Sequence, residues 1–170
     1  MTALSIARHR TALNRTDLSR PVRLALEDGL ITQETSVFDY GCGKGNDLRL
    51  LRSRGIRCNG WDPTYHPHNE RTPADVVNLG YVINVIEDPA ERVAALRNAW
   101  TLTQKLLAVS ARLTLEAASG SQTPYEDGCL TGLGTFQKYF EQRELREWID
   151  QSLGASSVPA APGIFYPTLR

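Results

Sequence analysis

The sequence has few of the features that mark secreted, membrane or metal-binding proteins. Its three cysteines are scattered, without the C-x-x-C spacing of zinc or redox sites: Cys42, Cys58 and Cys129. No apolar run approaches the length of a membrane span, and the first residues lack the apolar core of a signal peptide. These absences predict a cytoplasmic protein with reduced thiols and no membrane association.

The sequence also lacks a net charge. It has 19 basic and 19 acidic side chains, so the whole chain gives no electrostatic signal for nucleic acid or a membrane surface. The first 23 residues are a local exception, with one acid, Asp17, against five arginines: Arg8, Arg10, Arg15, Arg20 and Arg23. Such an arm either binds phosphates or packs back on the domain, and charge alone does not decide between the two.

Metal-ligating clusters are scarce as well. His66-Pro67-His68 supplies at most two ligands, whereas a metal site needs three or four. We therefore expect no metal. A chain of 170 residues with 41% apolar content is large enough for one core. We predict a basic N-terminal arm and helix over residues 1–35 and one domain over residues 36–170.

The most informative stretch is Val37-Phe38-Asp39-Tyr40-Gly41-Cys42-Gly43-Lys44-Gly45-Asn46-Asp47-Leu48. It is typical of an apolar strand, a glycine turn and the first turn of a helix. Glycines at every second position let the backbone turn tightly and let a ligand lie directly against the main chain. The sequence therefore predicts a nucleoside-bearing cofactor at the carboxyl edge of a parallel sheet.

The spacing of the glycines distinguishes between two cofactor classes. A dinucleotide fingerprint is G-x-G-x-x-G and places a pyrophosphate at the helix N-terminus. Here the spacing is G-x-G-x-G, and Asp39 precedes the first glycine by two residues. A carboxylate there repels a pyrophosphate but attracts the ammonium and sulfonium of S-adenosylmethionine. Asp62, at the end of a second strand, is placed to accept both hydroxyls of a ribose.

Alternating strand and helix patterns predict a parallel sheet with helices on its faces. We expect strands over 36–40, 57–61, 74–79 and 105–111, and helices after Ser19, over about 46–54, after Asp88 and over 140–153. Ser19 and the Asp88–Glu91 capping box are the predicted helix starts. Residues 116–134 are rich in glycine, serine and threonine and predict a loop or lid over the strand ends.

These motifs resemble the class I S-adenosylmethionine-dependent methyltransferases, on the evidence of residues 37–47, Asp62 and Ala74–Tyr81. The resemblance implies a Rossmann-like α/β fold: a mostly parallel sheet with an antiparallel C-terminal hairpin, here with an N-terminal helical extension. The eleven residues from Pro63 to Pro73 are too few for the usual helix and third strand, so one strand–helix unit is shortened. The adenine contacts that this unit usually supplies are therefore unassigned.

The resemblance also implies the cofactor site. S-adenosylmethionine is the expected cofactor and S-adenosylhomocysteine the expected product. Its predicted binding residues are Asp39, Gly41, Cys42, Gly43, Gly45, Asp62, Pro63, Asn78 and Leu79. Methyl transfer is an in-line displacement at an activated carbon, so positioning carries most of the catalysis and no catalytic triad is needed.

The predicted acceptor site involves Asn78, Tyr81 and Arg112. Asn78-Leu79-Gly80-Tyr81 is similar in spacing to the N-P-P-Y of methyltransferases that act on amino groups of bases, although both prolines are missing. Either Asn78 and Tyr81 recognise an amino group, or Asn78 contacts the cofactor and Tyr81 packs on a helix. Arg112 either holds an anionic group of the acceptor or forms a surface ion pair. The aromatic run 134–140 either stacks on a base or is core under the lid.

A narrower resemblance extends over most of the chain. Five blocks are similar to the bacterial DNA phosphorothioation-associated methyltransferase family: Arg8–Ala12, Leu18–Val22, Phe38–Asp47, Asn78–Pro89 and Gly134–Phe140. This resemblance implies DNA or a nucleotide-type acceptor as substrate and DNA as a partner. Two alternatives stay open: a small-molecule methyltransferase, and a cofactor-binding regulatory module without turnover.

Overall fold

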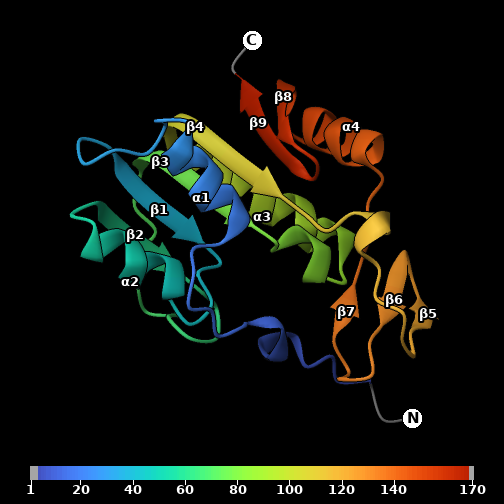
Figure 1. Ribbon diagram of the computed structural model, residues 1–170. Helices are drawn as coiled ribbons and strands as arrows, with labels where there is room; N and C mark the ends of the chain where they lie inside the picture. Colours follow the sequence, from blue (N-terminus) through green and yellow to red (C-terminus); the bar gives the residue numbers. More distant parts are fainter. Residues whose placement is uncertain (1–3, 169–170) are drawn as a thin grey trace.

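Short apolar strands form the centre of the molecule, and burial on both faces suits them to parallel pairing. The computed structural model describes residues 4–168, and six of its strands form one sheet in the order β2-β1-β3-β4-β9-β8 (Figure 1). The strands are β1 Ser36–Tyr40, β2 Arg57–Trp61, β3 Ala74–Gly80, β4 Thr103–Ser110, β8 Ser156–Ala161 and β9 Ile164–Thr168. β1 to β4 are parallel, and the hairpin β8–β9 joins β4 antiparallel. The predicted α/β fold is confirmed.

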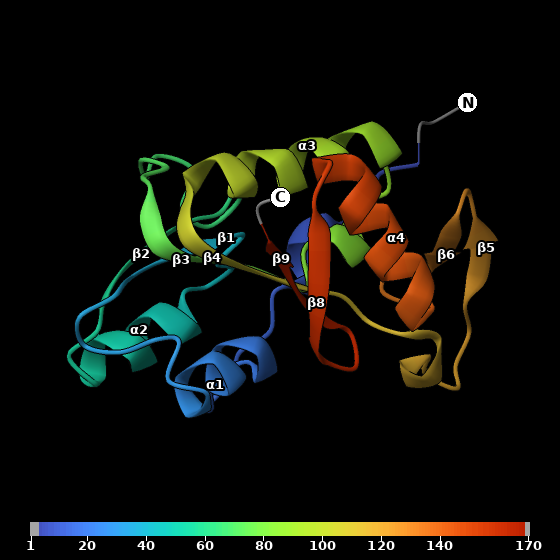
Figure 2. The same ribbon diagram turned by 90° about the horizontal axis from the view of Figure 1, so that it is seen from above.

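Helices cover both faces of this sheet. Figure 2 shows α3 and α4 on one face and α1 and α2 on the other. The helices are α1 Arg20–Glu27, α2 Asn46–Ser53, α3 Pro89–Leu102 and α4 Gln142–Leu153, with 3-10 turns η1 Arg8–Thr11, η2 Ile83–Val85 and η3 Thr114–Glu116. Within residues 4–168, no helix combines the length and the apolar character needed to cross a membrane.

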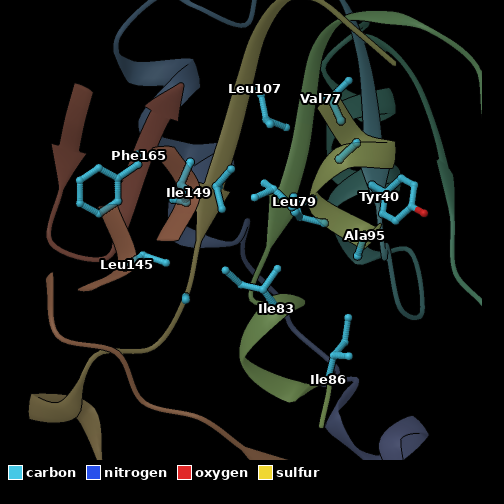
Figure 3. Close-up of a cluster of buried hydrophobic side chains, with 14 of the residues drawn as sticks. Tyr40, Val77, Leu79, Ile83, Ile86, Ala95, Leu107, Leu145, Ile149 and Phe165 are labelled. Atoms are coloured by element: carbon cyan, nitrogen blue, oxygen red, sulfur yellow. The ribbon is translucent and has the colours of Figure 1, made fainter. Parts of the chain in front are cut away.

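Each face of the sheet has its own hydrophobic cluster. The larger one joins β3 and β4 to α3 and α4 through side chains such as Leu79, Leu107 and Ile149 (Figure 3). The smaller one joins α1 and α2 to the opposite face, where Val22 and Leu51 are buried. The N-terminal helix thus shares a core with the sheet, because its apolar side covers residues that β1 to β3 turn to that face.

The connection from β2 to β3 is short, as predicted. Residues 62–73 contain no helix and no extended strand, only an isolated bridge between Asp62 and His66. The sheet consequently ends at β2 on this side. The predicted shortening of one strand–helix unit is confirmed.

Two predicted capping interactions are not formed, because the side chains concerned bond to residues far away in the sequence. Ser19 precedes α1, but its Oγ donates to Asp47 Oδ2 at 2.6 Å and makes no cap hydrogen bond. Asp88 does cap α3 by accepting from the Ala90 N–H at 2.9 Å. Glu91 does not complete a capping box, since its carboxylate pairs with Arg8 instead.

The predicted lid is not simply a loop. Its residues and those that follow form a three-stranded antiparallel sheet: β5 Thr123–Tyr125, β6 Gly128–Leu130 and β7 Phe136–Gln137. Phe136 is fully buried, and the Tyr125 ring meets it edge-on at 6.4 Å between centroids. The composition of these residues predicts a loop because such short strands depend on tertiary contacts more than on local propensity.

A buried arginine ties this small sheet to the main fold. Arg92 of α3 donates to Asp127, in the β5–β6 turn, at 2.7 and 3.1 Å. Its Nη2 also donates to the Ile86 carbonyl at 2.8 Å. The hydrogen bonds from Arg92 hold the pKa of the Asp127 carboxyl below its usual value. Residues 92 and 127 are far apart in the sequence, so no local pattern indicates this contact.

Gly128→Ala tests how closely the small sheet is packed. A Cβ at Gly128 would lie 2.6 Å from both the Gln137 carbonyl oxygen and a Phe136 ring carbon. We expect the free energy of unfolding, measured by urea denaturation, to fall by about 1–3 kcal/mol. Gly132→Ala is the matched control, because a Cβ there meets nothing within 4 Å. A control loss as large as that of Gly128→Ala would contradict the packing explanation.

Candidate active site

The parallel strands end at one cleft, where ligands of open α/β sheets bind. The cleft has a volume of about 1150 Å³ and is lined by the residues that follow β1, β2, β3 and β4. Residues 8–13, Arg15 and parts of the small sheet also line it. In Figure 1 the dark blue N-terminal segment lies beyond the arrowhead of β1 and runs toward β7.

The glycine loop needs its glycines for backbone reasons. The φ angles of Gly41, Gly43 and Gly45 are 82°, 55° and 82°, all in the left-handed region that side chains disfavour. A Cβ at Gly41 would also lie 2.5 Å from a Val82 methyl carbon. The loop folds over β2 by donating the Gly41 N–H to the Trp61 carbonyl at 2.8 Å. A cradle without side chains therefore borders the cleft.

The floor of the cleft holds a buried carboxyl group. Asp39 is 5% exposed, and its Oδ1 accepts from Asn78 Nδ2 at 3.0 Å. Burial, with added repulsion from Asp47, raises the pKa of Asp39 to about 7. The Asn78 hydrogen bond and the charge of Arg15 oppose this rise. A cationic ligand at this place would favour the ionised form of Asp39.

Asp62 fastens the glycine loop to the residues after β2. Its Oδ2 accepts from the Gly43 N–H at 3.0 Å, and its Oδ1 accepts from the Thr64 and Tyr65 N–H groups at 2.9 and 3.0 Å. A carboxylate oxygen with one such bond keeps a lone pair, so Oδ2 remains able to accept from a hydroxyl in the cleft. Asp62 therefore combines loop anchoring with the capacity to bind a ribose.

Two asparagines on the cleft wall carry buried acceptors without a partner among residues 4–168. They are Oδ1 of Asn78, whose Nδ2 is engaged by Asp39, and Oδ1 of Asn84 in η2. An unsatisfied buried polar atom costs about 1–3 kcal/mol, so such an atom at a cleft is a candidate contact for a ligand. The sequence analysis did not single out Asn84, because the block Asn78–Pro89 gives no signal for which of its polar side chains stays unpaired in the fold.

Cys42 lies within the glycine loop and lines the cleft. Burial and the nearby carboxylates of Asp39 and Asp62 raise the pKa of its thiol to about 12. The thiol therefore stays protonated at neutral pH and serves as a small apolar wall residue.

Most of the predicted site residues lie together along the cleft. Those on its wall are Asp39, Gly41, Cys42, Gly43, Asp62, Pro63, Asn78, Tyr81 and Arg112. Two do not line it. Gly45 is the N-cap of α2, and the Leu79 side chain is fully buried in the larger hydrophobic cluster.

Tyr81 and Arg112 stand on either side of the β3–β4 strand ends. Tyr81 has φ 56°, a conformation uncommon for a residue with a side chain, and its N–H donates to the Ser110 carbonyl at 3.0 Å. This backbone conformation turns the chain at the cleft edge immediately after Gly80. Arg112 lines the cleft, and its side chain makes no ion pair within the part of the chain that the structure describes.

Aromatic residues line the cleft near the short connection from β2 to β3. Trp61 lies 5.2 Å from Tyr40 between ring centroids, and the Arg71 guanidinium carbon lies 4.9 Å from the centre of the Trp61 ring. The Tyr40 hydroxyl accepts from Asn98 Nδ2 at 3.4 Å. These residues give the cleft a partly aromatic wall next to Asp62.

The N-terminal segment is attached to the domain from several sides. Arg8 pairs with Glu87 at 2.8 Å and also with Glu91. The Tyr65 hydroxyl donates to the His9 carbonyl at 2.9 Å, and the Ala7 N–H donates to the Gly134 carbonyl at 3.0 Å. Of the two explanations for the basic arm, the structure supports packing back on the domain.

The aromatic run 134–140, which includes β7, is divided between core and cleft. Phe136 and Phe140 are buried, whereas Tyr139 lines the cleft and accepts from Gln122 Nε2 at 3.2 Å. His66 is next to the glycine loop, 3.5 Å from a Cβ built at Gly45. Across residues 4–168, no group of three or more histidine, cysteine, aspartate or glutamate side chains is arranged to hold a metal ion.

Comparison with solved structures identifies similar folds. DesVI from Streptomyces venezuelae is 15% identical, with a TM-score of 0.61, 88% of this chain and 92% of that chain covered. The sugar N-methyltransferase KedS8 from a Streptoalloteichus species is 11% identical, with a TM-score of 0.60 over 99% and 89% of the two chains. A Burkholderia thailandensis 1,6-didemethyltoxoflavin-N1-methyltransferase, solved with S-adenosylhomocysteine, is 15% identical, with a TM-score of 0.52 over 96% and 76%.

At these identities the likeness shows the fold alone, and among curated proteins no sequence matches the chain. A family model described as a methyltransferase domain matches residues 7–152, which include the glycine loop, both acidic strand ends and the small sheet. The chain therefore belongs to this methyltransferase domain family.

Proposed function

We propose that this methyltransferase transfers the methyl group of S-adenosylmethionine to a small-molecule amine or hydroxyl compound inside the cleft. The observation that carries the proposal is a cleft of about 1150 Å³ at the strand ends, lined on its outer side by the N-terminal segment. Pockets for one drug-sized ligand measure about 300–1,000 Å³, so this volume suits a cofactor and a small acceptor together.

The residues at the glycine loop fit the cofactor. Asp39 suits its ammonium, Asp62 suits its ribose hydroxyls, and the unpaired Oδ1 of Asn78 accepts from a donor in the cleft. The wall formed by Trp61 and Arg71 offers a flat surface for adenine where the third strand is shortened. When bound, S-adenosylmethionine supplies an electrophilic methyl group on a sulfonium.

The acceptor end is proposed to lie between η2 and the small sheet. The backbone carbonyl of Asn84 accepts from the N–H of Lys138, the residue that follows β7, at 2.7 Å. Its free Oδ1 would accept from an N–H or O–H of the acceptor and so orient the nucleophile. Tyr81 and Arg112 line the same cleft, and Arg112 suits an anionic substituent of the acceptor.

DNA or a nucleotide-type acceptor is the second candidate, and unpaired Arg112 near the Asn78–Tyr81 motif favours it. A base extruded from DNA would be small enough for such a cleft. Against DNA, most of the basic arm is engaged by the protein itself. Arg8 and Arg23 form ion pairs, and Arg20 donates to the Pro162 carbonyl.

A transfer assay distinguishes the candidates. The protein is incubated with S-adenosylmethionine labelled on the methyl group, together with either the small-molecule fraction of a host-cell extract or host DNA. We expect the label in the small-molecule fraction and no label in DNA. Label in DNA would instead support the second candidate, with retention on DNA that weakens as salt rises. S-adenosylhomocysteine binding without any transfer would indicate a regulatory module.

Asp39→Asn tests the electrostatic role of the buried carboxylate. The pKa of Asp39 is about 7 in the folded protein and 3.8 in the unfolded chain. Ionising Asp39 therefore lowers the free energy of unfolding as the pH rises from 4 to 7. We expect the variant to gain on the order of 2 kcal/mol of unfolding free energy at pH 8 and little at pH 4. Calorimetry should show weaker S-adenosylhomocysteine binding at pH 8. Binding equal to that of the wild type would contradict the ammonium contact.

Asn84→Leu tests the acceptor site separately from the cofactor site. The side chains are similar in size, and the change removes a buried amide whose oxygen has no partner. We expect an unfolding midpoint that is unchanged or higher, S-adenosylhomocysteine affinity within about twofold, and loss of methyl transfer. Retained transfer would show that Asn84 does not orient the acceptor.

A further inference from the structure

Arg15 differs from the other four arginines of the basic arm because its side chain has no partner among the residues that the structure describes. Arg8 and Arg23 form ion pairs, and Arg10 and Arg20 donate to the Leu133 and Pro162 carbonyls. Arg15 lines the cleft, and within residues 4–168 its side chain has neither an ion pair nor a hydrogen bond. A partly buried arginine that lines a cleft and has no partner is available to an anionic ligand group.

The backbone around Arg15 is fixed to the helix that follows the glycine loop. On one side, the Leu13 carbonyl accepts from Asn46 Nδ2 at 3.2 Å. On the other side, the Ser19 N–H and Oγ donate to Asp47 at 2.7 and 2.6 Å. Asn46 and Asp47 are the first two residues of α2. Because both flanks are fastened there, Arg15 belongs to the glycine-loop end of the cleft.

Charges of opposite sign therefore meet at this end. Asp39 lies on the cleft floor, and the charge of Arg15 acts on it by lowering its pKa. The neighbouring carboxylate of Asp47 is occupied by Ser19. The carboxylate of Asp39 and the guanidinium of Arg15 therefore remain available to a ligand. This pair is complementary to an α-amino acid, whose ammonium and carboxylate are bonded to the same carbon.

We propose that Arg15 binds the carboxylate of the methionine portion of the cofactor, while Asp39 binds the ammonium on the same carbon. The inference rests on the proposed function of this cleft. A guanidinium offers two parallel N–H donors to a carboxylate, which gives both affinity and orientation. Holding the amino-acid portion at two points would restrict how the cofactor can turn within the cleft.

Calorimetry with two ligands tests this inference without any acceptor. S-adenosylhomocysteine has the amino-acid group, whereas 5′-methylthioadenosine has the same thioether nucleoside without it. We expect Arg15→Gln to weaken S-adenosylhomocysteine binding by about tenfold or more, with 5′-methylthioadenosine binding unchanged. Arg15→Lys should restore part of the loss. Arg23→Gln is the matched control, because Arg23 pairs with Glu27 on the exposed side of α1, and it should bind both ligands normally.

The outcomes separate the inference from the proposed function. Unchanged S-adenosylhomocysteine affinity in Arg15→Gln would overturn the carboxylate contact. An equal loss for both ligands would also overturn it, since it would show that Arg15 supports the loop rather than the carboxylate. If neither ligand binds the wild-type protein, the cofactor site itself is wrong, and the proposed function fails together with the inference.

Discussion

Pairing of β1 with β3 is the constraint on which the candidate site depends. In this parallel register Asp39 lies directly opposite Asn78, so a carboxyl group and an amide meet at the floor of the cleft. The same pairing brings the glycine loop and the turn at Tyr81 to one edge of the sheet. Shifting β1 by one residue would turn Asp39 toward the opposite face of the sheet, and shifting β3 by one residue would do the same to Asn78.

Much of the fold could be predicted because its signals are local. The strands β1 and β3 are short, mostly apolar segments, and Asp39 and Asp62 mark two strand ends that line the cleft. The wrong predictions are the helix caps whose side chains bond to residues far away in the sequence. Ser19 bonds to Asp47 and Glu91 to Arg8, so capping patterns that span three residues could not reveal where these side chains go.

The candidate site also has one part that local sequence patterns predict and one part that only the folded chain reveals. The glycine spacing predicts the cofactor end, since the backbone itself imposes that pattern. No motif singles out Asn84 or Arg15. Their significance comes from what the folded chain leaves unpaired: a buried amide oxygen, and an arginine that lines the cleft. The N-terminal segment, which composition alone presents as a basic arm, contributes a wall to the cleft and shares a core with the sheet.

The protonated state of Cys42 has a consequence for a protein that handles an alkylating agent. A thiolate in the glycine loop would be a strong nucleophile beside an electrophilic carbon and would compete with the intended acceptor. Burial and two neighbouring carboxylates keep the proton on this sulfur, with a pKa of about 12. The two carboxylates that we propose as cofactor contacts would thus also keep this thiol from being methylated.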